Sequence, residues 1–98
     1  MPKRADANQP RIVARYREHG ATVSSLHMVG GGVPDLVVGL AGVTDLVEVK
    51  NPAQVPSKRR LTPQEQRWHD EWRGSAVIVE TEDDVDLHVA GMRERGQK

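Results

Sequence analysis

The apolar positions of the chain fall into segments with strand-like and helix-like spacing. Apolar side chains dominate the stretches 33–40 and 44–50, which a short turn separates. Runs of this length predict two neighbouring β-strands. A looser alternation over 21–29 predicts a strand before them, and the unbroken apolar run within 75–80 predicts a last strand buried on both faces.

Three other segments have the apolar spacing of helices. The segment 8–19 aligns Ile12, Val13 and Tyr16 on one stripe, with Asn8 placed to cap its start. A second helix is expected over 62–73, because Thr62 and Glu65 have the spacing of a capping box around a first-turn proline.

The third predicted helix begins after Thr81 and runs to the glycine at position 96. The resulting order is αβββαβα, with the last strand returning parallel to a neighbour by a right-handed crossover. We therefore expect one α/β domain over residues 1–98, a central mixed sheet flanked by helices. Residues 1–7 and 96–98 are polar ends that we expect to be loose.

The amino-acid composition indicates what kind of core the protein has and where it is located. The chain has no cysteine, no phenylalanine, one tyrosine and two tryptophans, so its core should be aliphatic. No apolar run approaches the ~20 residues that span a bilayer, and we expect a soluble cytoplasmic protein. Trp68 and Trp72 have helical spacing, which favours packing on the sheet over the alternative of stacking on nucleic-acid bases.

The charges balance, with 14 basic and 14 acidic residues. A net charge of zero argues against indiscriminate nucleic-acid binding. The distribution is uneven, however, because basic residues gather in the first segment and at 58–60, and acidic residues gather over 80–86. We expect a local basic surface with the acidic end facing away, or else ordinary solvated faces. The basic positions are Lys3, Arg4, Arg11, Arg15, Arg17, Lys58, Arg59 and Arg60.

Candidate chemistry lies on the two central strands. Glu48 and Lys50 are two positions apart, so they share one face of their strand, and Asp35 at the mouth of the neighbouring strand can reach the same place. Burying such charges is costly unless they have partners. Two carboxylates and a lysine at one place suit a hard divalent cation beside a charge-stabilising group. The plain alternative is a strand-edge ion pair and a turn-capping acid.

The same residues carry a family resemblance. Pro34-Asp35, then twelve residues, then Glu48-Val49-Lys50 resembles the PD-(D/E)xK nuclease signature. The wider run, including Leu61-Thr62-Pro63 at a helix start, is similar to the VRR-NUC branch and to related phage Holliday-junction resolvases. The resemblance covers roughly residues 9–80. It implies a restriction-endonuclease-like core and a metal-dependent endonuclease that cuts branched DNA as a homodimer in a bacterial or phage-infected cell.

The resemblance also implies roles for individual residues. Asp35, Glu48 and the main-chain carbonyl of Val49 would hold Mg²⁺ or Mn²⁺, as one ion or two, and Lys50 would assist the chemistry. Family members often carry a glutamate where this chain has Gln9, which makes Gln9 an accessory candidate. A family glutamine near the metal has three competing counterparts here, at positions 64, 65 and 66, and we assign none of them.

The loop at 51–60 leaves directly from the expected site. Its Lys58, Arg59 and Arg60 are candidate DNA contacts, or a solvated connection. Two other functions stay open. One is a non-catalytic nucleic-acid-binding protein that keeps the fold, which the missing glutamate supports. The other is a nuclease subunit that acts only with a partner.

Overall fold

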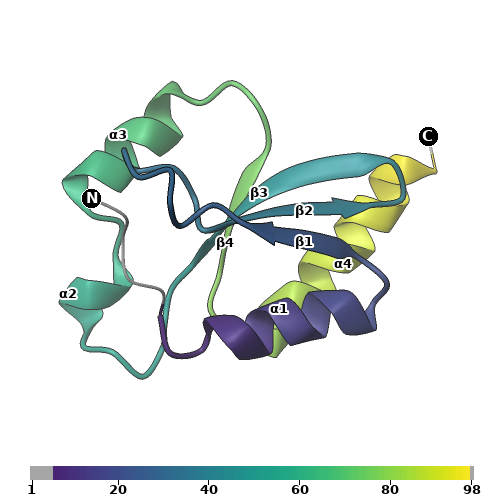
Figure 1. The fold of residues 1–98 in the computed structure, drawn as a ribbon, viewed down its shortest axis with the longest axis horizontal. Helices are drawn as coiled ribbons and strands as arrows, with labels where there is room; N and C mark the ends of the chain where they lie inside the picture. The colour runs from purple at the N-terminus through teal and green to yellow at the C-terminus, as the bar shows by residue number, and fades with distance from the viewer. Residues whose placement is uncertain (1–5, 98) are drawn as a thin grey trace.

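The computed structural model describes residues 6–97, and Figure 1 shows the arrangement of its elements. Four strands form one sheet, and helices lie beside it. In chain order the elements are α1 (Gln9–Glu18), β1 (Thr22–Ser25), β2 (Leu36–Leu40), β3 (Val43–Val49), α2 (Pro56–Arg59), α3 (Pro63–Glu71), β4 (Ala76–Val79) and α4 (Glu82–Gly96). The short helix α2 was not expected from the sequence. It lies within the loop predicted at 51–60.

The sheet is mixed, as predicted, with strand order β1-β2-β3-β4. β1 and β3 both pair antiparallel with β2, and β4 pairs parallel with β3. β2 and β3 form a hairpin in which Ala41 and Gly42 both have positive φ, 56° and 77°. Two successive positive φ values are typical of the tight turns that match strand twist. This hairpin fixes the register of the two strands that carry the candidate site.

The core lies between one face of the sheet and the helices α1 and α4 (Figure 1). Its side chains are aliphatic apart from Tyr16, as the composition predicts. The fully or nearly buried members are Ile12, Tyr16, Ala21, Leu36, Val38, Val47, Val49, Val79, Val85, Val89 and Met92.

The opposite sheet face is less covered, and we call it the open face. It carries Val37, Leu46, Ala76 and Ile78 on alternating positions of the strands. Ile78 is 47% exposed and the other three are half-buried. The expectation that the last strand is buried on both faces is therefore wrong, because within residues 6–97 the helices α1 and α4 cover only the other side.

Two local expectations also need correction. Trp68 is half-buried and Trp72 is 44% exposed, and neither belongs to the hydrophobic core. Asn8 makes no capping hydrogen bond at the start of α1. Its amide instead donates to the carbonyl oxygens of Lys50 and Glu80, at 3.1 and 2.9 Å. This side chain therefore joins the ends of β3 and β4.

The capping boxes at Thr62 and Thr81 are both present. In each, the threonine side chain accepts from the backbone of the third helical residue, whose carboxylate accepts in return from the threonine backbone. These reciprocal bonds satisfy two donors at each helix start that would otherwise lack partners. The helices therefore begin where the sequence predicts.

The basic first helix and the acidic last helix neutralise each other. Arg15 donates to both carboxylate oxygens of Asp86 at 2.7 Å, and His19 lies 2.6 Å from the same carboxylate. Hydrogen bonds from Arg15 and His19 hold the pKa of Asp86 below its ordinary range. Arg11 pairs with Glu82 at 3.6 Å. The acids therefore do not face away from this basic segment. Lys3 and Arg4 lie outside the described residues.

A second polar cluster is buried at Asp45 on β3. Its carboxylate accepts from His88 Nε2 at 2.6 Å and from the guanidinium of Arg95, and the His88 ring also contacts the Tyr16 hydroxyl at 2.7 Å. Burial alone would raise the pKa of Asp45. The hydrogen bonds from Arg95, His88 and Ser75 outweigh burial and hold that pKa below its ordinary value.

The expectation of loose ends falls mainly on residues 1–5 and 98, which lie outside the described part. Within that part Gly96 belongs to α4. None of the helices among residues 6–97 has the length and apolar character needed to cross a membrane.

We predict that Asp45→Asn lowers the free energy of unfolding by about 2 kcal/mol at pH 7, because hydrogen bonds to a buried charge are lost. Since the folded state depresses the pKa of Asp45, its ionised form stabilises the fold above about pH 4, and this contribution falls as pH drops below that value. Urea unfolding at pH 7 and pH 3 measures both effects. The exposed Asp83→Asn is the control. A loss of equal size at both pH values would contradict the account.

Candidate functional site

Asp35 and Glu48 face each other at one end of the β2–β3 hairpin. The last pair in the register is Leu36 with Val47, so one step further places Asp35 opposite Glu48. Directly opposed residues of antiparallel strands project to the same face. Asp35 is 3% exposed and Glu48 is fully buried. The hairpin therefore brings the two predicted carboxylates together on the face that also carries Leu46.

The Asp35 carboxylate continues the ladder beyond the end of β2. Its Oδ2 accepts from the backbone N–H of Val49 at 2.7 Å, and its own carbonyl accepts from Leu26 N–H at 2.7 Å. The Val49 N–H therefore points to the Asp35 side of β3, away from the parallel partner strand β4.

Lys50 extends from the end of β3 into a buried ion-pair cluster. Its ammonium donates to Glu65 Oε1 at 2.7 Å and lies 3.9 Å from Glu48 Oε2. Lys50 is 7% exposed and Glu65 4%. Burial this deep is tolerated by an ammonium only with carboxylate partners close by. Lys50 thus pairs with Glu48 on β3 and with Glu65 on α3, and the register places Asp35 opposite Glu48.

Glu65 is the site residue that the sequence did not assign. It fits a capping role, and it performs that role, because its Oε1 also accepts from Thr62 N–H at 2.8 Å. The same oxygen therefore holds both the start of α3 and the Lys50 ammonium. A signal was present in the sequence, since Glu65 is an acid in the first turn of a helix that follows the basic loop after Lys50.

The three glycines at 30–32 position the loop between β1 and β2 against α3. All three have positive φ, and a Cβ on Gly32 would lie 2.6 Å from the carbonyl oxygen of Gln64. Only glycine allows this close approach. The loop and α3 line a small pocket of about 180 Å³ beside Glu65. His27 on this loop bonds Ser25 at 2.7 Å.

Gln9 lies at the start of α1 with its side chain buried at 8% exposure. Its Oε1 has no hydrogen-bond partner among residues 6–97. The neighbouring Asn8 ties this end of α1 to the main chain of Lys50. Gln9 therefore stays a candidate accessory residue, with an amide oxygen that the described fold leaves unsatisfied.

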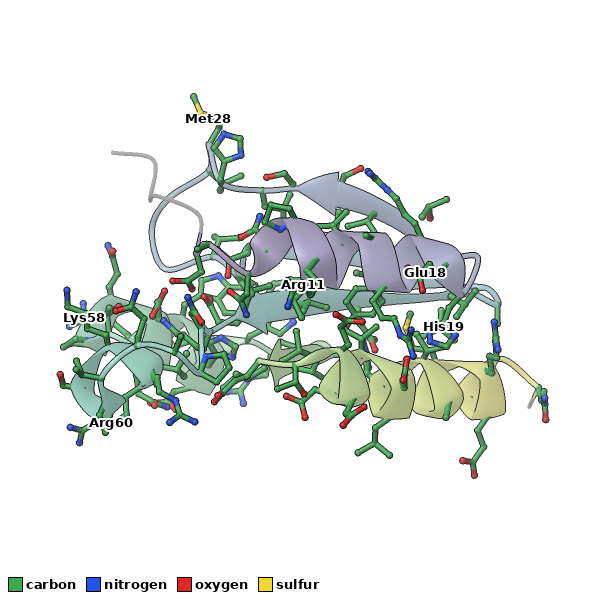
Figure 2. All side chains as sticks on the ribbon, turned by 90° about the horizontal axis from the view of Figure 1, so that it is seen from below. Arg11, Glu18, His19, Met28, Lys58 and Arg60 are labelled. Atoms are coloured by element: carbon green, nitrogen blue, oxygen red, sulfur yellow. The ribbon has the colours of Figure 1, made fainter. Side chains whose placement is uncertain are left out.

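The three predicted DNA-contact residues differ in whether they form ion pairs. Arg59 pairs with Glu80 at 3.0 Å. Lys58 and Arg60 are exposed, have no ion pair with any residue described, and line a groove of about 930 Å³ beside the start of α3. Figure 2 shows both at the end of the molecule away from His19 and Glu18. Lys58 and Arg60 thus lie at the end of the molecule that carries α2 and α3.

The residues present suit a hard divalent cation. Two carboxylates and a carbonyl are oxygen donors of the kind Mg²⁺ takes, and Mg²⁺ keeps several waters rather than requiring a full set of protein ligands. Among residues 6–97 no group of three or more His, Cys, Asp or Glu side chains is placed to hold a metal by itself. Water and the Val49 carbonyl would have to complete the coordination at Asp35 and Glu48.

Comparison with known proteins supports the fold. Neither the protein-family models nor the curated proteins give a match to the chain. A solved structure described as a VRR_NUC domain is similar, with 28% sequence identity and a TM-score of 0.63 over 84% of this chain and 89% of that one. With its mixed four-stranded sheet and flanking helices, the chain has the VRR-NUC type of PD-(D/E)xK nuclease fold.

Proposed function

We propose that this protein is a metal-dependent DNA endonuclease that hydrolyses phosphodiester bonds in branched DNA. One observation supports it most strongly. Asp35, Glu48 and Lys50 come from two neighbouring strands and are buried together, with the Lys50 ammonium 3.9 Å from Glu48. Burying a cluster of this composition destabilises the fold unless the charges are well paired, and buried, clustered charges in a functional site are common.

Asp35, Glu48 and the Val49 carbonyl would hold Mg²⁺ or Mn²⁺. The bound ion would lower the pKa of a water and offset charge on the scissile phosphate. Asp35 is held for this task by the Val49 N–H at 2.7 Å. Lys50 would donate a hydrogen bond to the phosphate oxygen on which charge develops, or orient the attacking water. Glu65 would keep the Lys50 ammonium in place through the 2.7 Å contact.

The proposed substrate is a branched duplex such as a four-way junction, cut by a homodimer with one site on each of two opposing strands. A domain of 98 residues offers few phosphate contacts by itself, and two copies would double them. Sedimentation of the protein with and without junction DNA measures this stoichiometry.

A non-catalytic binding protein is the second candidate function. Two features of the metal-binding residues support this function. Gln9 stands where related enzymes often carry an acid. Within residues 6–97 there is no group of three carboxylates placed to hold a metal. Such a protein would bind the junction tightly and leave it uncut in any metal. A nuclease subunit that needs a partner would not cleave the junction alone and would cleave it in the complex.

We predict that the wild-type protein cuts a labelled four-way junction with Mg²⁺ or Mn²⁺ and not with EDTA. Glu48→Gln should abolish cleavage because a ligand charge is removed. Lys50→Ala should lower the rate by about 10²-fold or more because a charge-stabilising donor is lost. Denaturing gels of junction, duplex and single-strand substrates measure both.

The matched control for this assay is Glu94→Gln, an exposed carboxylate on α4. It should cleave like the wild type. Circular dichroism should show that each variant is folded. Wild-type rates in Glu48→Gln, or cleavage that survives chelation, would rule out the proposed mechanism.

A second prediction concerns Glu65. Glu65→Gln keeps an oxygen for the Thr62 cap but removes the charge that holds Lys50, so the cleavage rate should fall about tenfold with little change in junction affinity. Glu71→Gln, an exposed acid on the same helix, is the control. A loss of folding stability without any kinetic change would assign Glu65 to capping alone.

A third prediction concerns the cationic groove. Lys58→Ala with Arg60→Ala should reduce the slope of log K against log salt by about 2, because each phosphate contact contributes about 0.9. Binding should weaken similarly for junction and duplex. Filter binding at several salt concentrations measures the slope. The double variant Arg17→Ala with Arg93→Ala removes two exposed cations elsewhere and should leave it unchanged.

A further inference from the structure

The two tryptophans form a stacked pair outside the hydrophobic core. The ring centroids of Trp68 and Trp72 are 4.8 Å apart, and the ring planes differ by 20°. Trp72 is 44% exposed. Both tryptophans thus lie outside the core, which aliphatic residues, Tyr16 and Met92 fill. The exposed part of this pair offers an aromatic surface to a ligand.

The pair lies on the side of α3 that carries Glu65. Positions 65, 68 and 72 are separated by three and four residues, which places their side chains on one side of a helix. The helical rise from Glu65 to Trp72 is about 10 Å. The side chain that holds Lys50 and the aromatic pair are therefore two turns apart on one rigid element.

The Trp72 ring is held in place from two directions. Trp68 stacks against it, and the backbone of Gly74 lies so close that a Cβ there would be 2.9 Å from Trp72 Nε1. The Trp68 ring in turn meets the His69 ring edge-on at 5.2 Å. A ring fixed in this way presents its remaining surface without losing much side-chain entropy on binding.

Cations flank the pair. Arg67 precedes Trp68 and Arg73 follows Trp72; both are exposed, and neither forms an ion pair within the part of the chain described. The acids of this segment are Asp70, which accepts a hydrogen bond from Gln66 at 2.8 Å, and the exposed Glu71. An aromatic surface bordered by free arginines has the composition of a site for single-stranded nucleic acid.

We propose that Trp68 and Trp72 bind an unstacked nucleobase of the DNA strand that enters the site, with Arg67 and Arg73 toward the phosphates on either side. The inference rests on the proposed function for the class of ligand. Branch points and ends supply such unstacked bases, whereas an intact duplex does not.

A second copy of this chain fits the surface less well. A stable interface needs about 800 Å² from each partner and a core depleted of charge. Charged residues surround the tryptophans along α3, at positions 67, 70, 71 and 73. A nucleobase needs only one ring face and tolerates, or uses, the neighbouring arginines.

The chain is suited to a direct test because both of its tryptophans belong to this pair. Intrinsic fluorescence is measured in EDTA, so that no strand is cut. The ligands are a single-stranded thymidine heptamer, a heptamer of the same length with abasic sugars, and a blunt duplex. The thymidine strand should quench the emission and the abasic strand should not. Equal quenching by both strands would overturn the proposal.

Variants provide the second readout, by anisotropy of a labelled thymidine heptamer. Trp72→Ala should weaken binding roughly tenfold, as expected from the loss of one base–aromatic stack. Trp72→Phe should retain most of the affinity and controls for folding. Leu87→Ala, an exposed apolar residue on α4, should bind like the wild type. Unchanged binding in Trp72→Ala, or a dimer that becomes a monomer in that variant, would assign the pair a different role.

The two proposals fail in different ways. Metal-dependent cleavage without base-dependent quenching would leave the nuclease and remove the base site. Base-dependent quenching without cleavage in any metal would leave the base site on a binding protein.

Discussion

The register of the β2–β3 hairpin is the constraint on which the rest of the site depends. It sets Asp35 opposite Glu48, and the bond from Val49 N–H to the Asp35 carboxylate at 2.7 Å continues the pairing where the β2 backbone stops. A slip of one residue would turn every side chain of one strand to the other face. Val47 and Val49 would then leave the core, and Glu48 would enter it. The same hydrophobic pattern that specifies the core therefore specifies the site.

The two ends of the molecule on either side of this hairpin differ in how their charges are paired. α1 and α4 lie over the core face and neutralise each other through Arg15 and Asp86. At the other end, Lys58 on α2 and Arg67 on α3 have no ion pair in the described part, and α3 contributes Glu65 to the cluster around Lys50. Charges that stabilise the fold and charges left available for a ligand are thus separated in space, even though the net charge of the chain is zero.

Much of this arrangement could be predicted from the sequence, because strand alternation and capping residues are local signals. The four strands, the mixed sheet, the capping box at Thr62 and the helix start at Thr81 followed from such signals. The predictions that were wrong concern residues whose positions depend on packing between distant parts of the chain. Helical spacing put Trp68 and Trp72 on one stripe, but it could not show that this stripe lies outside the hydrophobic core. Asn8 had the chemistry of a cap, yet its amide bonds two strand ends that are 42 and 72 residues away.

Glu65 and Asp45 show the same limit within polar clusters. Capping explained Glu65 locally, and its place in a first turn after the basic loop could not show that the same oxygen reaches Lys50. Asp45 lies in an apolar strand, and its partners His88 and Arg95 come from the last helix. Periodicity assigns a side chain to a face, but its partner depends on how distant elements meet.

The central claim is that Asp35 and Glu48 share one metal ion. Titration of the DNA-free protein with Mn²⁺, followed by electron paramagnetic resonance, measures this directly. The account predicts saturable binding that weakens at least tenfold in Asp35→Asn and is unchanged in the exposed-site variant Asp83→Asn. Binding that is absent from the wild type, or equally strong in Asp35→Asn, would contradict it.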